Sequence, residues 1–190
     1  ALDIVSQGRF ELGLGAGWNE LESGAYGIEL GTLKERFDRF DEALIVISSL
    51  LNKEKTSFSG KYYTLQDARN EPKGPQQPLP ICIGGTGEKR TLRSVAHHAT
   101  HWNLPVFEDQ LFKQKYEVLK THCENIGTNI EDIKVSTHVF VEEGTTAASV
   151  ISEIVHQNQS GIDQSILYFQ PPIHLKQVEQ ITNALMSEFR

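Results

Sequence analysis

The chain has 190 residues, of which 18 are Lys or Arg and 25 are Asp or Glu, so its formal net charge is −7. A nucleic-acid-binding surface usually carries a basic stripe, and this sequence has none, so we expect neither nucleic acid nor an anionic membrane surface as a partner. With 38% hydrophobic residues the chain can bury one core, and we interpret residues 1–190 as a single domain.

The cysteines and the chain ends bear on location and completeness. Cys82 and Cys123 form no CxxC pair, which favours reduced core thiols in a cytoplasmic protein. No apolar run reaches the ~18 residues of a membrane span, and no signal peptide opens the chain. The chain begins at Ala1 and its only methionine is Met186, so we expect a fragment or a processed product.

The first strand is predicted over residues 9–14, and a glycine-rich turn follows it. A long helix is predicted over about residues 33–51, because apolar residues recur there at steps of three and four: Phe37, Phe40, Leu44, Ile47 and Leu51. Residues 56–80 place aromatic residues around Ser59-Gly60 and then crowd prolines together, which indicates a short hairpin and an extended excursion.

The rest of the chain alternates between strands and helices. Strands are predicted over residues 79–83, 101–104, 134–142 and 165–169, and helices over about 88–99, 107–126 and 146–157, with a final helix after Pro171-Pro172. Gly127 is the predicted C-cap of the second of these helices. About five strand–helix alternations predict a parallel sheet, and they fit an open doubly wound sheet as well as a barrel.

Two glycine-rich segments follow predicted strands and are candidates for binding an anion. The first runs from Gly13 to Trp18; it lacks the spacing of the dinucleotide fingerprint, and a tight turn explains it equally well. The second, Ile81 to Gly87, leaves a strand and enters a helix, so exposed N–H groups favour a phosphate over a simple helix N-cap. One β/α unit joins the two strands, so we expect them to be adjacent and parallel, with Gly17 and Gly84-Gly85 at one cleft.

Other polar and aromatic positions are less specific. Trp102-Asn103, at the end of a predicted strand, is open to two interpretations: a wall of a ring pocket, or a buried Trp beside a turn Asn. His97, His98 and His101 have no carboxylate at HExxH spacing, so we interpret them as a solvated helix end and predict no metal site. We interpret Arg36 and Arg39 as part of a solvated helix face.

Several ordered motifs together resemble the luciferase-like monooxygenase family. They are Gly8 to Trp18, Tyr26-Gly27, Glu35 to Leu44, Phe58 to Tyr63, Pro80 to Gly85 and Trp102-Asn103. Their order and spacing are similar up to about residue 105, and Gly85 to Leu92 is most similar to the coenzyme F-420 (deazaflavin)-dependent oxidoreductase branch. Relatives often read Ala-Asp-Gly-Trp where this chain has Ala99-Thr100-His101-Trp102, so no role is transferred to His101.

The resemblance implies the C-terminal portion of a (β/α)8 TIM barrel, with about five of eight β/α units and a Pro-rich excursion at 56–80. A complete barrel usually needs about 250 residues. The resemblance also implies contacts to the phosphate and ribityl chain of the cofactor from two loops, and we add Trp102 as a candidate for the ring pocket. The expected cofactor-binding residues are therefore Ala16, Gly17, Trp18, Gly84, Gly85 and Trp102.

By the resemblance, we expect a flavoprotein-like oxidoreductase that transfers a hydride between coenzyme F-420 and a small organic substrate. The alternatives are an FMN-dependent monooxygenase and a non-catalytic flavin-binding or interaction fragment of the same fold. No catalytic residue is assigned, because the resemblance places such residues in early strands that this chain lacks. We expect the chain alone to have little activity, and its exposed strand edges to favour a homo-oligomer.

Overall fold

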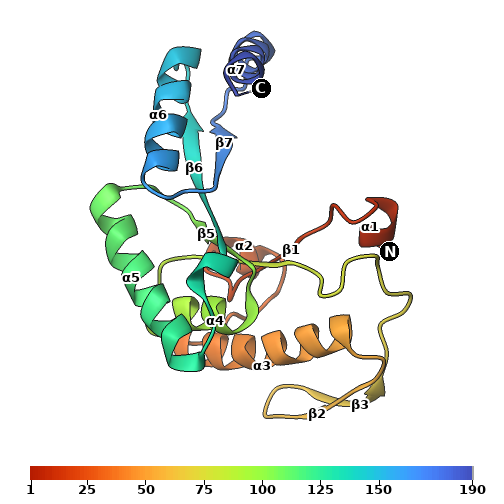
Figure 1. Cartoon of the computed structure of the whole chain (residues 1–190). Coiled ribbons are helices and arrows are strands. Elements are labelled where there is room, and N and C mark those ends of the chain that lie inside the picture. The colour runs from red at the N-terminus through yellow and green to blue at the C-terminus, as the bar shows by residue number, and fades with distance from the viewer. Residues whose placement is uncertain (190) are drawn as a thin grey trace.

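A computed structural model describes residues 1–189 and contains one five-stranded parallel sheet (Figure 1). The strand order is β1-β4-β5-β6-β7, and each neighbouring pair is parallel. The strands are β1 (Leu12–Leu14), β4 (Ile81–Gly84), β5 (His101–Leu104), β6 (Lys134–Val141) and β7 (Gln164–Phe169). The sheet curves as a half-barrel, so the predicted partial barrel is confirmed rather than an open doubly wound sheet.

Helices follow the strands as the alternation predicts. They are α1 (Leu2–Val5), α2 (Glu20–Ala25), α3 (Leu33–Asn52), α4 (Thr91–His98), α5 (Asp109–Ile126), α6 (Ala147–Gln159) and α7 (Leu175–Glu188), with a 3-10 turn at Ile130–Asp132. The short helices α1 and α2 were not predicted, because neither buries an apolar face that would reveal a helical period. Gly127 ends α5 with φ +73°, which confirms the predicted C-cap. Within residues 1–189, no helix has both the length and the apolar character that a membrane crossing requires.

Helix α3 is the long helix that the apolar period predicts. Thr32 and Glu35 form a capping box at its start, so two N–H groups at the helix end are satisfied by side chains. Phe40 and Leu44 are buried against the sheet side of the molecule. Helix α3 also holds the excursion, because the Glu42 carboxylate accepts hydrogen bonds from the backbone N–H groups of residues 61–63.

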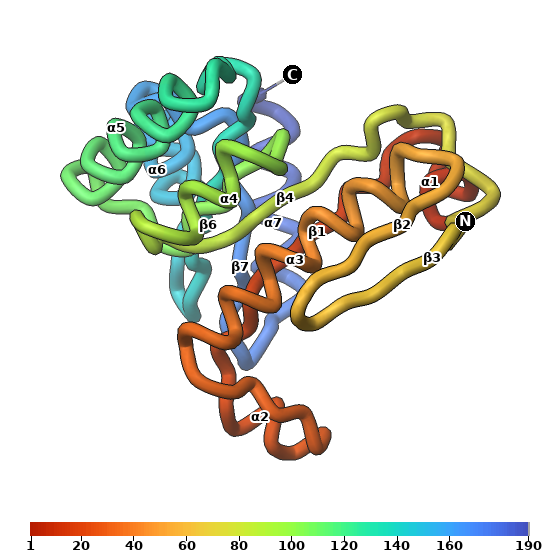
Figure 2. The backbone as a smooth tube through the Cα atoms, turned by 90° about the horizontal axis from the view of Figure 1, so that it is seen from below, coloured from red at the N-terminus to blue at the C-terminus, as the bar shows by residue number. Residues whose placement is uncertain are grey.

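The predicted excursion at 56–80 contains an antiparallel hairpin, β2 (Thr56–Ser59) and β3 (Thr64–Ala68). Figure 2 shows this hairpin running alongside α3, outside the five-stranded sheet. The extended segment after it returns to the sheet near the first residues of the chain, where Gln76 bonds to the carboxylate of Asp3 and the carbonyl oxygen of Phe10. The excursion is therefore held by hydrogen bonds at both ends.

Alternate residues along each strand face opposite sides of the sheet. Ile83, Trp102 and Val135 share one register row, are fully buried, and belong to the core formed with α4 and α5. Cys82 and His101 precede them by one residue and so face the concave inner side. Further along the inner side, Phe140 of β6 and Tyr168 of β7 are 41% and 51% exposed. The inner side is thus polar near β4 and β5 and aromatic near β6 and β7.

Candidate functional site

The two glycine-rich loops leave neighbouring parallel strands at the same edge of the sheet. Leu14, the last residue of β1, pairs with Ile83 of β4, so the chain continues into Gly15 and Gly84 side by side. This confirms the prediction that the two strands are adjacent and parallel. Gly85 has φ +119°, a conformation that side chains other than glycine's rarely adopt, so the turn itself requires glycine there.

The free backbone donors lie two residues later than the sequence predicted. The N–H of Gly85 donates to the carbonyl oxygen of Asn103 at 3.0 Å and is not available to a ligand. The N–H groups of Thr86 and Gly87 have no acceptor among residues 1–189. Helix α4 begins at Thr91 instead of residue 88, so a turn separates these donors from the helix. The free N–H groups therefore belong to the loop and not to the first turn of α4. The partial positive charge at the start of α4 acts on a bound anion only from a greater distance.

These donors belong to a groove of about 670 Å³ at the rim of the sheet. Its lining carries four cations and one carboxylate: Lys34, Lys89, Arg90, Lys115 and Glu88. Lys115 donates to Glu88 at 2.6 Å and lowers the pKa of that carboxyl. Lys34, Arg90 and Lys115 are ion-paired with carboxylates, so the features of the groove that can meet an anion are the N–H groups of residues 86 and 87 and the side chain of Lys89.

Arg90 fixes the loop that carries these donors. Its guanidinium donates to Asp38 at 2.9 Å and to Asp41 at 2.6 Å, both on α3, and lies 5.5 Å from the ring centre of Phe37. Lys34 and then Arg90, as hydrogen-bond donors, lower the pKa of the Asp38 carboxyl. Two charge-assisted bonds from one planar guanidinium restrict both position and orientation, so the loop after β4 is tied to α3.

Arg36 does the same for the first glycine loop. The sequence interpretation of a solvated residue is wrong here, since the Arg36 side chain is only 10% exposed. It donates to the carbonyl oxygen of Gly17 at 3.0 Å and to that of Gly31, and its Nε has no hydrogen-bond partner within residues 1–189. Arg39 is also partly buried and donates to the carbonyl oxygen of Glu29. A cavity of about 200 Å³ lies between this loop and α3, lined by Gly15, Ala16 and Arg36 among others.

The two tryptophans have opposite surroundings. Trp18 is 83% exposed at the end of the first glycine loop, where its ring is free to contact a ligand. Trp102 is fully buried and stacks on Phe112 of α5, with 6.2 Å between ring centres. Its indole Nε1 donates to the carbonyl oxygen of Gly85 at 2.9 Å. The pocket-wall interpretation of Trp102 therefore gives way to the buried-Trp interpretation, and Trp102 acts on the site by holding the Gly85 loop.

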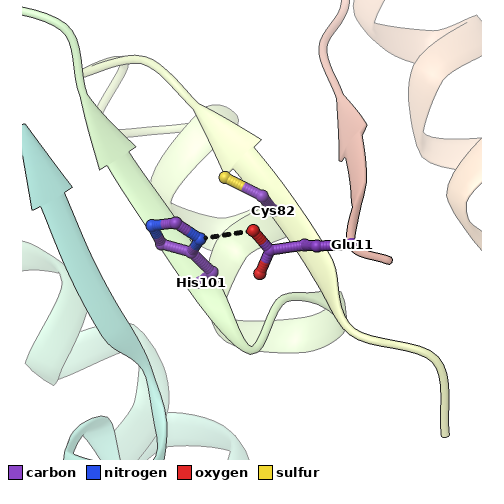
Figure 3. Close-up of side chains that lie close together, drawn as sticks. All are labelled: Glu11, Cys82 and His101. Atoms are coloured by element: carbon purple, nitrogen blue, oxygen red, sulfur yellow. Dashed lines mark hydrogen bonds and ion pairs between the residues drawn. The ribbon is translucent and has the colours of Figure 1, made fainter. Parts of the chain in front are cut away.

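The inner side of the sheet holds a polar cluster that spacing could not predict (Figure 3). His101 contacts the Glu11 carboxylate through Nδ1 at 2.8 Å and Ser136 Oγ through Nε2 at 2.7 Å. Asn103 donates to the same Ser136 Oγ at 2.9 Å. His101 is 4% exposed and is the first residue of β5, so the interpretation of a solvated helix end is wrong for this histidine. Cys82 lies next to the pair, and burial and then Glu11 raise the pKa of its thiol to about 11.

Several strand-end glycines have open space beside their backbone. An ideal Cβ at Gly13 or at Gly15 would meet no atom within 4 Å, and one at Gly84 would make only ordinary contacts with Asn103 at 3.8 Å. At Gly17, φ is +82° and a Cβ would lie 3.1 Å from Leu30, so that position is fixed by the turn. Open space beside the strand-end glycines, together with the free donors of residues 86 and 87, fits a ligand that approaches the backbone closely.

Comparison with known proteins identifies the relatives of this chain. The model of the family described as luciferase-like monooxygenase matches residues 1–185. The F420-dependent glucose-6-phosphate dehydrogenase of Kineococcus radiotolerans is 37% identical over 86 residues, which are 45% of this chain and 25% of that protein. The pyrimidine monooxygenase RutA of Cronobacter sakazakii is 31% identical over 98 residues, 50% of this chain and 29% of that protein. The matched segments thus span between a quarter and a third of these curated relatives.

Two solved structures share the fold over nearly the whole chain. An F420-dependent secondary alcohol dehydrogenase in complex with an F420-acetone adduct superposes with a TM-score of 0.84 and 16% identity, covering 96% of this chain and 71% of that one. The coenzyme F420-dependent tetrahydromethanopterin reductase of Methanopyrus kandleri gives 0.81 and 14%, covering 100% of this chain and 77% of that one. At this identity the likeness establishes the fold alone.

Proposed function

The chain belongs to the luciferase-like monooxygenase family, and on that premise we propose that it contributes the cofactor-binding rim of an oxidoreductase that transfers a hydride between coenzyme F-420 and a small organic substrate. The observation that carries the proposal is the pair of glycine loops at the ends of neighbouring strands β1 and β4. Free N–H groups at residues 86 and 87 and a cation-lined groove follow the second loop.

Each part of the rim has a distinct task in this proposal. The N–H groups of Thr86 and Gly87 bind phosphate oxygens, and Gly84 and Gly85 leave room for them to approach. Ala16, Gly17 and Trp18 line the other side of the bound chain. When bound, the cofactor supplies the hydride chemistry, and the protein supplies binding, orientation and exclusion of water. Trp102, Arg36 and Arg90 are positioning residues, since each holds one of the loops through hydrogen bonds.

A second function is favoured by a specific comparison. The similarity to a pyrimidine monooxygenase over 98 residues supports an FMN-dependent monooxygenase. The same rim would then hold the phosphate of FMN, so the geometry of the glycines alone does not separate the two. The curated matches to F420-dependent dehydrogenases favour the deazaflavin.

Titration of the protein with coenzyme F-420 and, separately, with reduced FMN tests the proposal, with cofactor fluorescence or absorbance as the readout. We expect saturable binding of one F-420 per chain, and weaker binding of reduced FMN. Tighter binding of reduced FMN would replace the proposal by the monooxygenase alternative. Failure of both cofactors to bind would overturn the assignment of the rim.

A further inference from the structure

Three chemically different donor groups converge on the inner side of the sheet, below the glycine rim. They are the carboxylate of Glu11, the thiol of Cys82 and the imidazole of His101, and one donor atom from each lies within 4.8 Å of the other two. Figure 3 shows the three side chains pointing into the same space from neighbouring segments of the sheet. Glu11 precedes β1, whereas Cys82 and His101 face each other across the β4–β5 pair.

The geometry is close to that of a tetrahedral metal site. Zinc bonds of about 2.3 Å to sulfur and about 2.0 Å to nitrogen or oxygen place the ligand atoms about 3.3–3.6 Å apart. His101 Nδ1 and Glu11 Oε2 are 2.8 Å apart, and no pair of donor atoms in the cluster is separated by more than 4.8 Å. The observed separations therefore bracket those that a tetrahedral site requires. Sulfur, imidazole and carboxylate together form a donor set that suits Zn²⁺ among common divalent ions.

The neighbours of the cluster prepare it for a cation. Ser136 Oγ contacts His101 Nε2 at 2.7 Å, and Asn103 donates to the same oxygen. This contact fixes the imidazole plane and directs Nδ1 toward Cys82 and Glu11, as groups hydrogen-bonded to metal-binding histidines do. Cys82 is a free cysteine whose Sγ lies within 4.8 Å of a donor atom of each of the other two side chains. A cation placed between the three side chains would therefore meet sulfur, nitrogen and oxygen together.

We propose that Glu11, Cys82 and His101 bind one Zn²⁺ ion, with the fourth coordination position open to water from the inner side of the sheet. Binding forms a sulfur–zinc bond and releases the thiol proton of Cys82 to solvent. His101 binds through Nδ1, and the proton that it shares there with Glu11 moves to Nε2, where Ser136 Oγ accepts it. The site lies one inner layer below Gly84 and Asn103, about 6.6 Å along the strands. It joins β1, β4 and β5 and is separate from the rim proposed for the cofactor.

Titration of the metal-free, reduced protein with Co²⁺, followed by displacement with Zn²⁺, tests the site. We expect one Co²⁺ per chain, tetrahedral ligand-field bands, a thiolate-to-cobalt charge-transfer band, and release of about one proton per metal at neutral pH. Zn²⁺ should abolish the bands and raise the thermal unfolding midpoint, because an ion that binds only the folded state stabilises it.

Matched variants locate the ion. Cys82→Ser should remove the charge-transfer band. Loss of a group that is only hydrogen-bonded to a metal ligand costs about 10–100-fold in metal affinity. Glu11→Gln removes a ligand itself, so we expect it to weaken metal binding by more than that. Cys123→Ser is the control, since this buried thiol belongs to α5 and packs in the core, so its loss should leave the band unchanged. Absence of a thiolate band in the wild-type protein, or its survival in Cys82→Ser, would overturn the proposal. No cofactor is present in these measurements, so their outcome is independent of the proposed function.

Discussion

The indole Nε1 of Trp102 donates a hydrogen bond to the carbonyl oxygen of Gly85, 2.9 Å away. This bond links the buried core under β5 to the loop that carries the free N–H groups of residues 86 and 87. The N–H of Gly85 donates in turn to the carbonyl oxygen of Asn103. Both the N–H and the carbonyl oxygen of Gly85 are therefore bonded to residues of β5. The loop is therefore preorganised by the strand next to it.

Trp102→Phe tests the contribution of this bond. Phe keeps most of the stacking on Phe112 but leaves the Gly85 carbonyl oxygen without its donor, which should cost about 1–3 kcal/mol of unfolding free energy. Trp18→Phe is the control and should leave stability unchanged, because Trp18 is 83% exposed. Urea denaturation of both variants provides the measurement. Equal stability of the two would mean that the indole bond does not hold the loop.

Arg36→Ala should loosen the first glycine loop. The variant removes the donors to the carbonyl oxygens of Gly17 and Gly31 from a side chain that is 10% exposed, so we expect a loss of about 1–3 kcal/mol and faster hydrogen exchange around residues 15–19. Arg93→Ala, at an exposed position of α4, is the matched control. Exchange rates in Arg36→Ala that equal those of the control would contradict this role.

The stability of the hairpin should depend on the charge of Glu42. Burial opposes ionisation, but the N–H groups of Tyr62, Lys61 and Tyr63 outweigh it and lower the pKa of this carboxyl from its ordinary value of 4.5. A lowered folded-state pKa contributes stability that is present above the unfolded value and is lost as pH falls through the folded value. Unfolding measured from pH 7 to pH 3 should therefore show a shallower acid loss in Glu42→Gln. The exposed Glu117→Gln is the control, and a slope that matches between the two variants would rule out this contribution.

The reactivity of Cys82 should rise steeply with pH. The thiolate is the reactive form, and burial and Glu11 raise the pKa of the thiol to about 11. In the metal-free Cys123→Ser protein, the alkylation rate by iodoacetamide should increase about tenfold per pH unit from pH 8 to pH 10. A rate that levels off near pH 8.5 would indicate an unperturbed thiol.

The fold was largely predictable because its signals are local. The apolar period of Phe40 and Leu44 predicts α3, and the four residues His101–Leu104 were predicted as a strand with the observed bounds. The helix predicted from residue 88 begins at Thr91, after a turn in which Arg90 forms ion pairs with Asp38 and Asp41. The sequence near position 90 does not indicate these ion-pair partners, because they lie on a helix about fifty positions earlier.

The site was predictable only in part, for the same reason. Strand-end glycines indicate a ligand rim from sequence alone, whereas the use of the Gly85 N–H by Asn103 depends on the register between β4 and β5. The pair of Glu11 and His101 is separated by 90 positions and has no characteristic spacing. His101 is buried because it lies on the inner side of the sheet. The interpretation of the histidines as a helix end could not predict this burial.

We propose that the glycine rim binds coenzyme F-420, and the affinity of Gly84→Ala for this cofactor tests the proposal most directly. Gly85→Val is a poor probe, because φ of +119° strains any side chain there. At Gly84 a Cβ makes only ordinary contacts, so the fold should be kept while a methyl group projects toward the ligand. Gly24→Ala is the control, since a Cβ on this α2 residue meets nothing within 4 Å.

Dissociation constants for F-420 should be measured by fluorescence titration of the wild-type protein and both variants, with unfolding curves recorded in parallel. We expect Gly84→Ala to bind at least tenfold more weakly, a loss of about 1.4 kcal/mol, with stability like that of the wild type. Gly24→Ala should bind as the wild-type protein does. Unchanged F-420 affinity in a well-folded Gly84→Ala protein would contradict the claim and leave the glycines with a role in the turn only.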